Sequence, residues 1–410
     1  MTQQTFPATV ITLSSGLRLV YMKDNSEVEY FGTIVNSGSR DDPGDRFGLA
    51  HFVEHVIFKG TARRRSWHII NRMESCGGEL NAYTTKETTV VYTIFPRGNF
   101  ARASDLIGDL ICNSIFPSRE LEKEREVVAD EIDQYRDMPS EAVFDDFEDL
   151  LFKDSGLGHN ILGSAEDLRA FDSELCREYL TANFTVDNMV VFYSGSLSAT
   201  VVSRSVERNF SSLPSACRRE KRIVPPPAAF FDRAVNLGNH QANTVTGSRI
   251  PSMYSPERHS FALLANILGG PGMNSLLNVE LRERRGLVYA VEASTAFLTD
   301  TGLLTIYFGC DHDDTKRCRR ITAAVIRKIA DNGVSDRFLS IARRQFIGQQ
   351  TLAADIRENS IISVARSVLY FGRVSSRKER VECIEAVSAD DLRRCAATLL
   401  TEGLSTLTLE

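Results

Sequence analysis

The chain has 410 residues, of which 42% are hydrophobic and 25% are charged, and this length corresponds to two or three folded domains of about 150 residues each. The net charge is −6 and basic residues are interleaved with acidic ones, which argues against nucleic acid as a partner. Since no apolar run approaches the ~18 residues of a membrane span and residues 1–7 resemble no targeting signal, we expect a cytoplasmic protein without membrane contact.

The first half of the chain alternates between strand-like and helix-like patterns. Strands are predicted at residues 10–13, 17–21, 28–35 and 88–95, where β-branched and aromatic residues lie between turn residues. Helices are predicted from Gly48, at 103–111, from Ser118 and at 143–151, where apolar residues recur at helical spacing.

The clearest division of the chain lies at residues 217–229, where a charged stretch leads into three consecutive prolines. Such a segment is typical of an exposed and stiff linker. It separates residues 1–216 from residues 230–410, and each part is long enough to form its own hydrophobic core. We therefore predict an N-terminal and a C-terminal domain joined by this linker.

The second half repeats the alternation of the first. Strands are predicted at 288–297 and 303–308, and helices at 321–329 and along the proline-free stretch 337–369. The segment from Asp172, which precedes a predicted strand, is similar to the segment from Asp390, which precedes the last strand, and this indicates a duplication. We predict the α+β class, with two similar domains that each pack helices on a mixed sheet.

The eight cysteines contain no C-x-x-C pair. They are Cys76, Cys112, Cys176, Cys217, Cys310, Cys318, Cys383 and Cys395. We interpret them as reduced thiols of a cytosolic protein, so zinc ligands are not expected among them.

The most informative pattern is H-x-x-E-H, formed by His51, Glu54 and His55 in a mostly apolar segment that suits a helix. A helix projects residues four apart from one face, so both imidazoles can bind one zinc ion. Glu54 lies beside that face, where it can act as the general base toward a zinc-bound water. Two surface histidines and a glutamate are the alternative, but buried His and Glu need partners, which a metal ion supplies.

A catalytic zinc site needs a third protein ligand, and the segment 124–131 offers candidates. Glu124 and Glu131 are seven residues apart and therefore share a helix face. Glu131 could bind the metal while Glu124 orients a histidine or the water. The same segment carries further acidic residues, so an ordinary charged surface helix also explains the pattern.

The inverzincin signature H-x-x-E-H, followed by E-R-E-V-V-A-D-E, resembles the pitrilysin-type (M16) metallopeptidases, which include insulin-degrading enzyme and the mitochondrial processing peptidase. The resemblance implies that His51, His55 and Glu131 bind one zinc ion per chain and that Glu124 supports them. Phe58-Lys-Gly-Thr61 is similar to the segment that follows the family's zinc helix. The chain length fits the short subfamily, which implies two domains that face each other across a cleft, and chains that pair as homodimers or heterodimers around a closed chamber.

Residues 77–84, with the sequence Gly-Gly-Glu-Leu-Asn-Ala-Tyr-Thr, resemble the substrate-facing edge strand of the family. The residues implied to bind substrate are Asn81, Ala82, Tyr83 and Thr84. The residues themselves predict a helix stop at Gly77 and an extended segment after it, and an exposed strand edge can pair with a peptide main chain. Without the resemblance, Asn81 would be interpreted as an ordinary turn residue.

A second segment, residues 281–289, resembles the family's Arg-to-Tyr segment in the other domain. The resemblance implies that Arg282 and Tyr289 complete the active site. A phenol can donate a hydrogen bond to a tetrahedral oxyanion, and a guanidinium can hold substrate carbonyls or carboxylates. Arg284 and Arg285 compete in sequence, the family spacing selects Arg282, and a basic surface turn is the alternative from the residues alone.

We therefore expect a zinc-dependent endopeptidase that hydrolyses peptides or unfolded polypeptide segments in a closed chamber. Its expected partners are peptide substrates and either a second copy of the chain or a related chain. We expect it to bind neither nucleic acid nor a membrane. The alternative is a non-catalytic scaffold subunit of a larger complex, a role in which relatives usually have a degraded metal motif.

Overall fold

The computed structural model describes residues 8–44, 46–218 and 221–410. Residues 1–7, where the sequence predicts no targeting signal, and residues 219–220 of the expected linker lie outside the described part. Within the described residues, no helix has both the length and the apolar character needed to cross a membrane.

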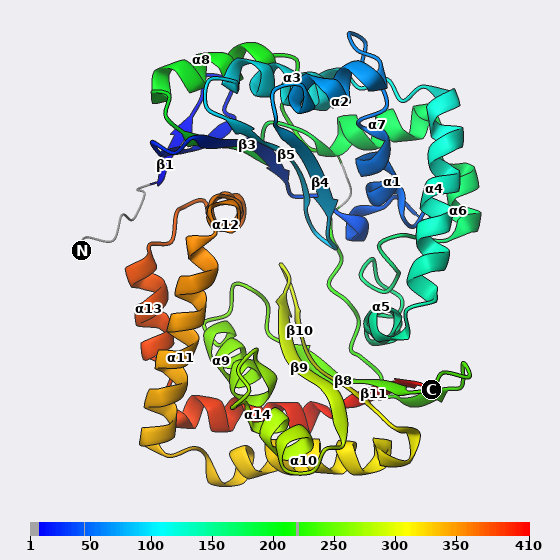
Figure 1. Cartoon of the computed structure of the whole chain (residues 1–410), viewed down its shortest axis with the longest axis vertical. Helices are drawn as coiled ribbons and strands as arrows, with labels where there is room; N and C mark the ends of the chain where they lie inside the picture. The colour runs from blue at the N-terminus through cyan, green and yellow to red at the C-terminus, as the bar shows by residue number, and fades with distance from the viewer. Residues whose placement is uncertain (1–7, 45, 219–220) are drawn as a thin grey trace. The chain divides into compact units, whose positions relative to one another are not determined.

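The chain divides into two compact units, each assembled from three separate segments (Figure 1). Unit 1 consists of Met1–Asp133, Asn160–Arg222 and Ala353–Ser375, and unit 2 consists of Gln134–His159, Ile223–Leu352 and Ser376–Glu410. The continuous halves 1–216 and 230–410 expected from the linker differ from these units in two segments. One segment of the N-terminal half belongs to unit 2, and one segment of the C-terminal half belongs to unit 1.

Unit 1 contains a six-stranded mixed sheet with the order β1-β2-β6-β3-β5-β4. Its strands are β1 (Ala8–Thr12), β2 (Arg18–Lys23), β3 (Val28–Val35), β4 (Glu79–Thr84), β5 (Thr89–Pro96) and β6 (Met189–Gly195). Strands β2 and β6 are parallel, and the other neighbours are antiparallel. The strand β4 is therefore an edge strand.

Helices cover both faces of this sheet. The helical segments of unit 1 are η1 (Ser39–Asp41), α1 (Leu49–Val56), α2 (Ser66–Glu74), α3 (Phe100–Asn113), α4 (Ser118–Arg136), α6 (Ala165–Ala170), α7 (Ser173–Asn183), α8 (Ala199–Asn209) and α12 (Arg357–Phe371). One face packs against α1 and α3 through side chains such as Val91. The opposite face packs against α12 through side chains such as Val90 and Tyr92, because successive residues of a strand point to opposite faces.

Unit 2 contains a five-stranded mixed sheet with the order β7-β11-β8-β10-β9. Its strands are β7 (Asp232–Val235), β8 (Ala242–Ile250), β9 (Val288–Phe297), β10 (Gly302–Cys310) and β11 (Ser405–Leu409). Its helical segments are α5 (Pro139–Leu151), α9 (Arg258–Gly269), η2 (Asn278–Glu283), η3 (His312–Asp314), α10 (Thr315–Asn332), α11 (Asp336–Asp355), α13 (Arg377–Glu385) and α14 (Ala389–Glu402). Strands β7 and β11 are parallel, and the other neighbours are antiparallel.

The two sheets share one topology. The order β2-β6-β3-β5-β4 in unit 1 corresponds to β7-β11-β8-β10-β9 in unit 2, with the last strand of each set between the first two. Asp172 and Asp390, which the sequence comparison paired, lie at the starts of α7 and α14, the helices before β6 and β11. Asp172 caps α7, and Asp390 lies in the first turn of α14. This correspondence supports the duplication, and the prediction of two α+β domains with mixed sheets is confirmed.

Each half of the chain also contributes one helix to the other unit. Helix α5 packs on β8 and β11 in unit 2, and α12 packs on β6 and β3 in unit 1, which are equivalent positions. The stretch expected to be largely helical at 337–369 consists of α11 and α12, which are separated at Ile356, whose backbone is extended. Leu339 before the break lies in the core of unit 2, whereas Ile361 after it lies in the core of unit 1.

Candidate active site

Helix α1, which carries both histidines of the H-x-x-E-H pattern, is fixed at its first turn by backbone geometry and by a carboxylate. Gly48 precedes the helix with φ 91°, and a Cβ there would lie 2.5 Å from the Leu162 carbonyl oxygen, so both conformation and space require glycine. The Asp42 carboxylate accepts hydrogen bonds from the amides of Gly48 at 2.7 Å and Ala50 at 2.8 Å. These bonds satisfy amide groups that the start of a helix leaves unpaired.

The apolar side chains of α1 anchor the helix in the core and leave one face for the histidines. The buried apolar residues are Leu49, Ala50, Phe52, Val53 and Val56. The rings of His51 and His55 lie side by side, with centroids 4.5 Å apart. The i, i+4 spacing therefore produces the paired imidazoles that the sequence predicts.

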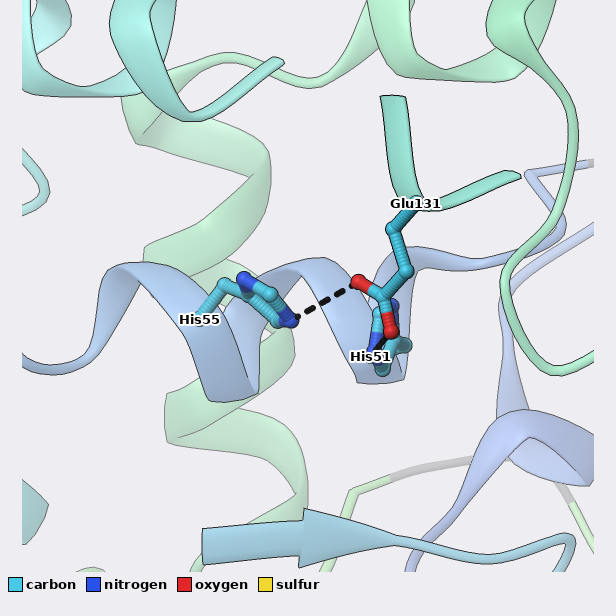
Figure 2. Close-up of side chains that lie close together, drawn as sticks. All are labelled: His51, His55 and Glu131. Atoms are coloured by element: carbon cyan, nitrogen blue, oxygen red, sulfur yellow. Dashed lines mark ion pairs between the residues drawn. The ribbon is translucent and has the colours of Figure 1, made fainter. Parts of the chain in front are cut away.

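Glu131 of α4 reaches both histidines (Figure 2). Its carboxylate oxygens lie 3.8 Å from Nε2 of His51 and 3.4 Å from Nε2 of His55. One potential ligand atom of each residue lies within 4.8 Å of the others, and no other His, Cys, Asp or Glu group in the described part of the chain meets this condition.

The geometry of this group fits a zinc ion. Ligand atoms held tetrahedrally at about 2.0–2.1 Å from zinc are about 3.3 Å apart, so the observed N···O separations of 3.4 Å and 3.8 Å need only small adjustments. Two imidazole nitrogens and one carboxylate oxygen are also donors that zinc prefers, and they leave a fourth position for water or substrate.

The two imidazoles differ in their tendency to hold a proton. Burial, reinforced by His55, lowers the pKa of His51 to about 3, so His51 is neutral and available as a ligand at neutral pH. Burial also acts to lower the pKa of His55, but the carboxylates of Glu124, Glu54 and Glu131 outweigh it, and the pKa is raised.

Glu124 hydrogen-bonds His55 through the ring nitrogen that does not face Glu131. Its Oε1 lies 3.0 Å from Nδ1 of His55, and its Oε2 lies 2.6 Å from Nζ of Lys59. Burial acts to raise the pKa of Glu124, but the hydrogen bonds to His55 and Lys59 outweigh it, so the net shift is downward. Glu124 is thus an ionised hydrogen-bond partner that turns Nε2 of His55 toward Glu131.

Two residues of this arrangement were missed in the sequence. Lys59 follows His55 by one helical turn, and this spacing was a signal that could have identified it. Asp42 gave no comparable signal, because it caps α1 from a turn that precedes Gly48 by six residues.

Glu54 lies on α1 between the histidine face and the edge strand. Burial raises its pKa, while Thr84 and His55 act in the opposite direction. The net increase brings the carboxylate closer to the proton affinity that a general base needs near neutral pH. Helix α1 contacts β4, and Thr84 at the end of β4 acts to lower the pKa of Glu54, so this end of the strand lies beside the carboxylate.

The predicted substrate-binding residues all lie on β4, at the edge of the sheet. Ala82 packs on the core at the α1 face, and Tyr83 packs on the core at the α12 face. Alternate residues of an edge strand direct backbone amide and carbonyl groups away from the sheet. The strand segment Asn81–Thr84 is therefore available for main-chain pairing next to the histidine group.

Arg282 and Tyr289 belong to unit 2, on η2 and β9. Arg284 and Arg285 form ion pairs with Glu280, whereas Arg282 is exposed and has no ion-pair partner among the described residues. The Tyr289 side chain is 57% exposed, and its hydroxyl donates a hydrogen bond of 2.8 Å to Asp311. Asp311 was not singled out from the sequence.

Comparison with known families gives two adjoining matches. A profile described as "Insulinase (Peptidase family M16)" matches residues 18–165, which include the histidine pair and Glu131. A profile described as "Peptidase M16 inactive domain" matches residues 170–346, which include Arg282 and Tyr289.

Relatives and solved structures resemble nearly the whole chain. An uncharacterized zinc protease of Mycobacterium tuberculosis is 30% identical over 397 residues, covering 95% of this chain and 90% of that protein. An uncharacterized zinc protease of Bacillus subtilis is 27% identical over 393 residues, covering 95% of both. The crystal structure of a protease from Helicobacter pylori matches with a TM-score of 0.90 at 18% identity, covering 98% of this chain and 99% of that one. That structural match concerns the fold alone.

Proposed function

Since the chain belongs to the M16 (insulinase) family of zinc proteases, we propose that it is an endopeptidase in which His51, His55 and Glu131 bind one zinc ion. Family membership confirms the resemblance inferred from H-x-x-E-H and the segment 124–131. The observation that carries the proposal is the convergence of two imidazoles from α1 and one carboxylate from α4 within 4.8 Å. The support of His55 by Glu124 and Lys59 strengthens it, because a metal-binding histidine typically donates its other ring N–H to a partner that fixes the ring.

The proposed mechanism assigns proton transfer to Glu54. Zinc bound by this group would act as a Lewis acid toward the scissile carbonyl and would acidify a bound water. Glu54 would accept the proton of the attacking water and then deliver it to the leaving amine, because its carboxylate is next to the histidine face and has a raised pKa. Glu124 would remain ionised and would only position His55.

We propose that the substrate is held as an extended segment along β4. A peptide that adds a strand to this edge would pair its main chain with residues 81–84. Thr84 lies beside Glu54, so this pairing would bring a peptide bond near the proposed base. Because only an extended chain can pair in this way, peptides and unfolded segments are the expected substrates.

Arg282 and Tyr289 are proposed to act on the substrate from unit 2. Arg282 is the arginine of its segment that is not engaged by Glu280, which supports its selection over Arg284 and Arg285. The Tyr289 phenol is exposed, and its single O–H donates to Asp311, so the hydroxyl would turn away from Asp311 to donate to an oxyanion. Pairing of the chain with a second copy or a related chain stays a prediction.

The scaffold alternative is weaker because all three residues of the metal group are present and meet. The decisive experiment is digestion of an internally quenched peptide by the purified chain, with bound zinc measured in parallel. We expect cleavage that a chelator abolishes and that added zinc restores. A zinc-loaded chain that cleaves no peptide in a broad library would overturn the proposal and favour the scaffold.

A further inference from the structure

One stripe of α12 follows the β4–β5 hairpin on the face of the sheet opposite α1. The stripe consists of Glu358, Ile362, Arg366 and Tyr370, which share a helix face at i, i+4 spacing. At one end Glu358 accepts a 2.5 Å hydrogen bond from the Tyr92 hydroxyl of β5. At the other end the Tyr370 hydroxyl donates to the Glu87 carbonyl in the hairpin turn at 3.3 Å. The stripe therefore holds a fixed register along the hairpin.

Arg366 is the exposed member of this stripe, and it reaches the edge strand. Its guanidinium donates a hydrogen bond of 3.3 Å to the hydroxyl of Tyr83, one of the residues proposed to contact the peptide. Arg366 has no carboxylate partner among the described residues, and Glu358 of the same stripe is already bonded to Tyr92. Most N–H donors of Arg366 are thus available to a ligand.

We propose that Arg366, positioned by Tyr83, binds a carboxylate side chain of the substrate and makes the enzyme prefer aspartate or glutamate at one position of the peptide. The inference rests on the proposed pairing of the peptide with β4. Side chains of an added strand alternate between the two faces of the sheet, so those on the α12 face pass Tyr83 and Arg366. A guanidinium fork matches a carboxylate in shape and charge.

Nearby acidic residues do not cancel this charge. Glu79 lies on the same face of β4, but it precedes Tyr83 by four residues, which is about 13 Å along a strand. Exposed charges separated by more than the Debye length of about 8 Å are largely screened at physiological ionic strength. Glu54 and Glu131 act at the α1 face, on the other side of the sheet. Glu358 also acts on the Tyr83 hydroxyl, but Arg366 acts on it more strongly, so Arg366 dominates the position opposite Tyr83.

The test uses the full-length, zinc-loaded chain and internally quenched peptides derived from one neutral parent. Each position in turn carries Glu, Gln or Lys, and kcat/KM is measured for every peptide. We expect one position at which Glu is favoured over Gln by about threefold to tenfold, the size of a partly screened charge pair. At the same position Lys should be disfavoured.

Variants then assign the preference to the proposed residues. Arg366→Met should remove it, Arg366→Glu should reverse it toward Lys, and Arg366→Lys should retain a reduced preference because the charge remains without the fork. Tyr83→Phe should weaken it, since the phenol that positions the guanidinium is lost. Arg204→Glu is the matched control, because Arg204 is an exposed arginine of α8, which packs on α3 at the other face of the sheet. This control should keep the wild-type ratio of Glu to Gln.

The outcomes separate this inference from the proposed function. Cleavage without any preference for a carboxylate, or with a preference that survives Arg366→Met, overturns the inference while it supports the peptidase activity. Absence of cleavage of every peptide by the zinc-loaded chain overturns the proposed function, and the inference with it. Zinc content and melting temperature of each variant show whether a lost preference comes from a misfolded site.

Discussion

Nζ of Lys59 lies 2.6 Å from Oε2 of Glu124, so an ammonium group fixes the carboxylate that holds His55. Lys59 follows the C-terminal end of α1 and pairs with Glu124 of α4, and Glu124 in turn bonds to the imidazole of His55. An unpaired, buried carboxylate at this position would be costly, and it would tend to take up a proton. Lys59 is thus a positioning residue for the metal group, although it contacts none of the proposed metal ligands directly.

Replacement of Lys59 by methionine should therefore weaken zinc binding. Loss of an outer hydrogen-bond partner typically costs about 10- to 100-fold in metal affinity, and we expect the lower end because Glu124 itself remains. The measurement is a chelator competition titration. Lys123→Met is the control, since Lys123 is an exposed lysine of α4 that pairs only with Glu120 among the described residues. Equal zinc affinity in Lys59→Met and the control would show that Glu124 needs no counter-charge.

Replacing any one of His51, His55 and Glu131 by alanine should remove most of the zinc, because three protein ligands are the minimum for a tight catalytic site. Metal analysis after dialysis measures this directly. Glu126→Ala is the matched control for Glu131→Ala, since Glu126 is an exposed glutamate of the same helix. Near-full zinc in Glu131→Ala would mean that the third ligand is another residue.

The variant Glu54→Gln should retain zinc and substrate and lose turnover. Glutamine keeps the size and hydrogen-bonding capacity of the side chain but cannot accept a proton at neutral pH, so we expect kcat to fall by about 10²-fold or more. Steady-state kinetics and zinc analysis on the same preparation test this. If the variant cleaves peptides at the wild-type rate, Glu54 is not the base.

For unit 2, Tyr289→Phe should lower kcat more than it raises KM and leave zinc content intact, because an oxyanion donor acts mainly in the transition state. The loss of transition-state stabilisation should be smaller than the ~2.7–4 kcal/mol of a well-studied oxyanion donor, since a metal ion would share the charge.

Arg282→Ala should raise KM as well as lower kcat if Arg282 holds the ground-state peptide. Arg284→Ala serves as the control, because Arg284 is paired with Glu280. Wild-type kinetics in both Tyr289→Phe and Arg282→Ala would remove these residues from the proposed site.

The sequence predicts those parts of the site that depend on local spacing. His51 and His55 need only a helix to share a face, and β4 needs only the glycines before it and an extended run. The approach of Glu131 depends on how α4 packs against α1, so the residues alone left it among several acids and the resemblance selected it. Asp42 and Arg366 could not be found in this way, because the first acts through backbone amides and the second is distant in sequence from Tyr83.

The exchange of α5 and α12 between the two halves of the chain also leaves no signal in local sequence patterns. Helix α12 buries Ile361, Ile362 and Val368 against the sheet of unit 1. Full burial of three such side chains contributes roughly 5–9 kcal/mol, which is comparable to the total stability of about 5–15 kcal/mol of a typical domain.

A fragment of residues 1–222, cut at the linker, should therefore expose the apolar face of its sheet. We expect low solubility, strong binding of a hydrophobic dye and no cooperative thermal transition. A second fragment, in which a flexible linker joins residues 1–222 to residues 353–375, should restore a cooperative transition because it returns α12 to its place. Calorimetry of both fragments beside the full chain is the measurement. If residues 1–222 alone melted cooperatively near the full-length temperature, α12 would be dispensable for unit 1, and the continuous half expected from the sequence would be an independent folding unit.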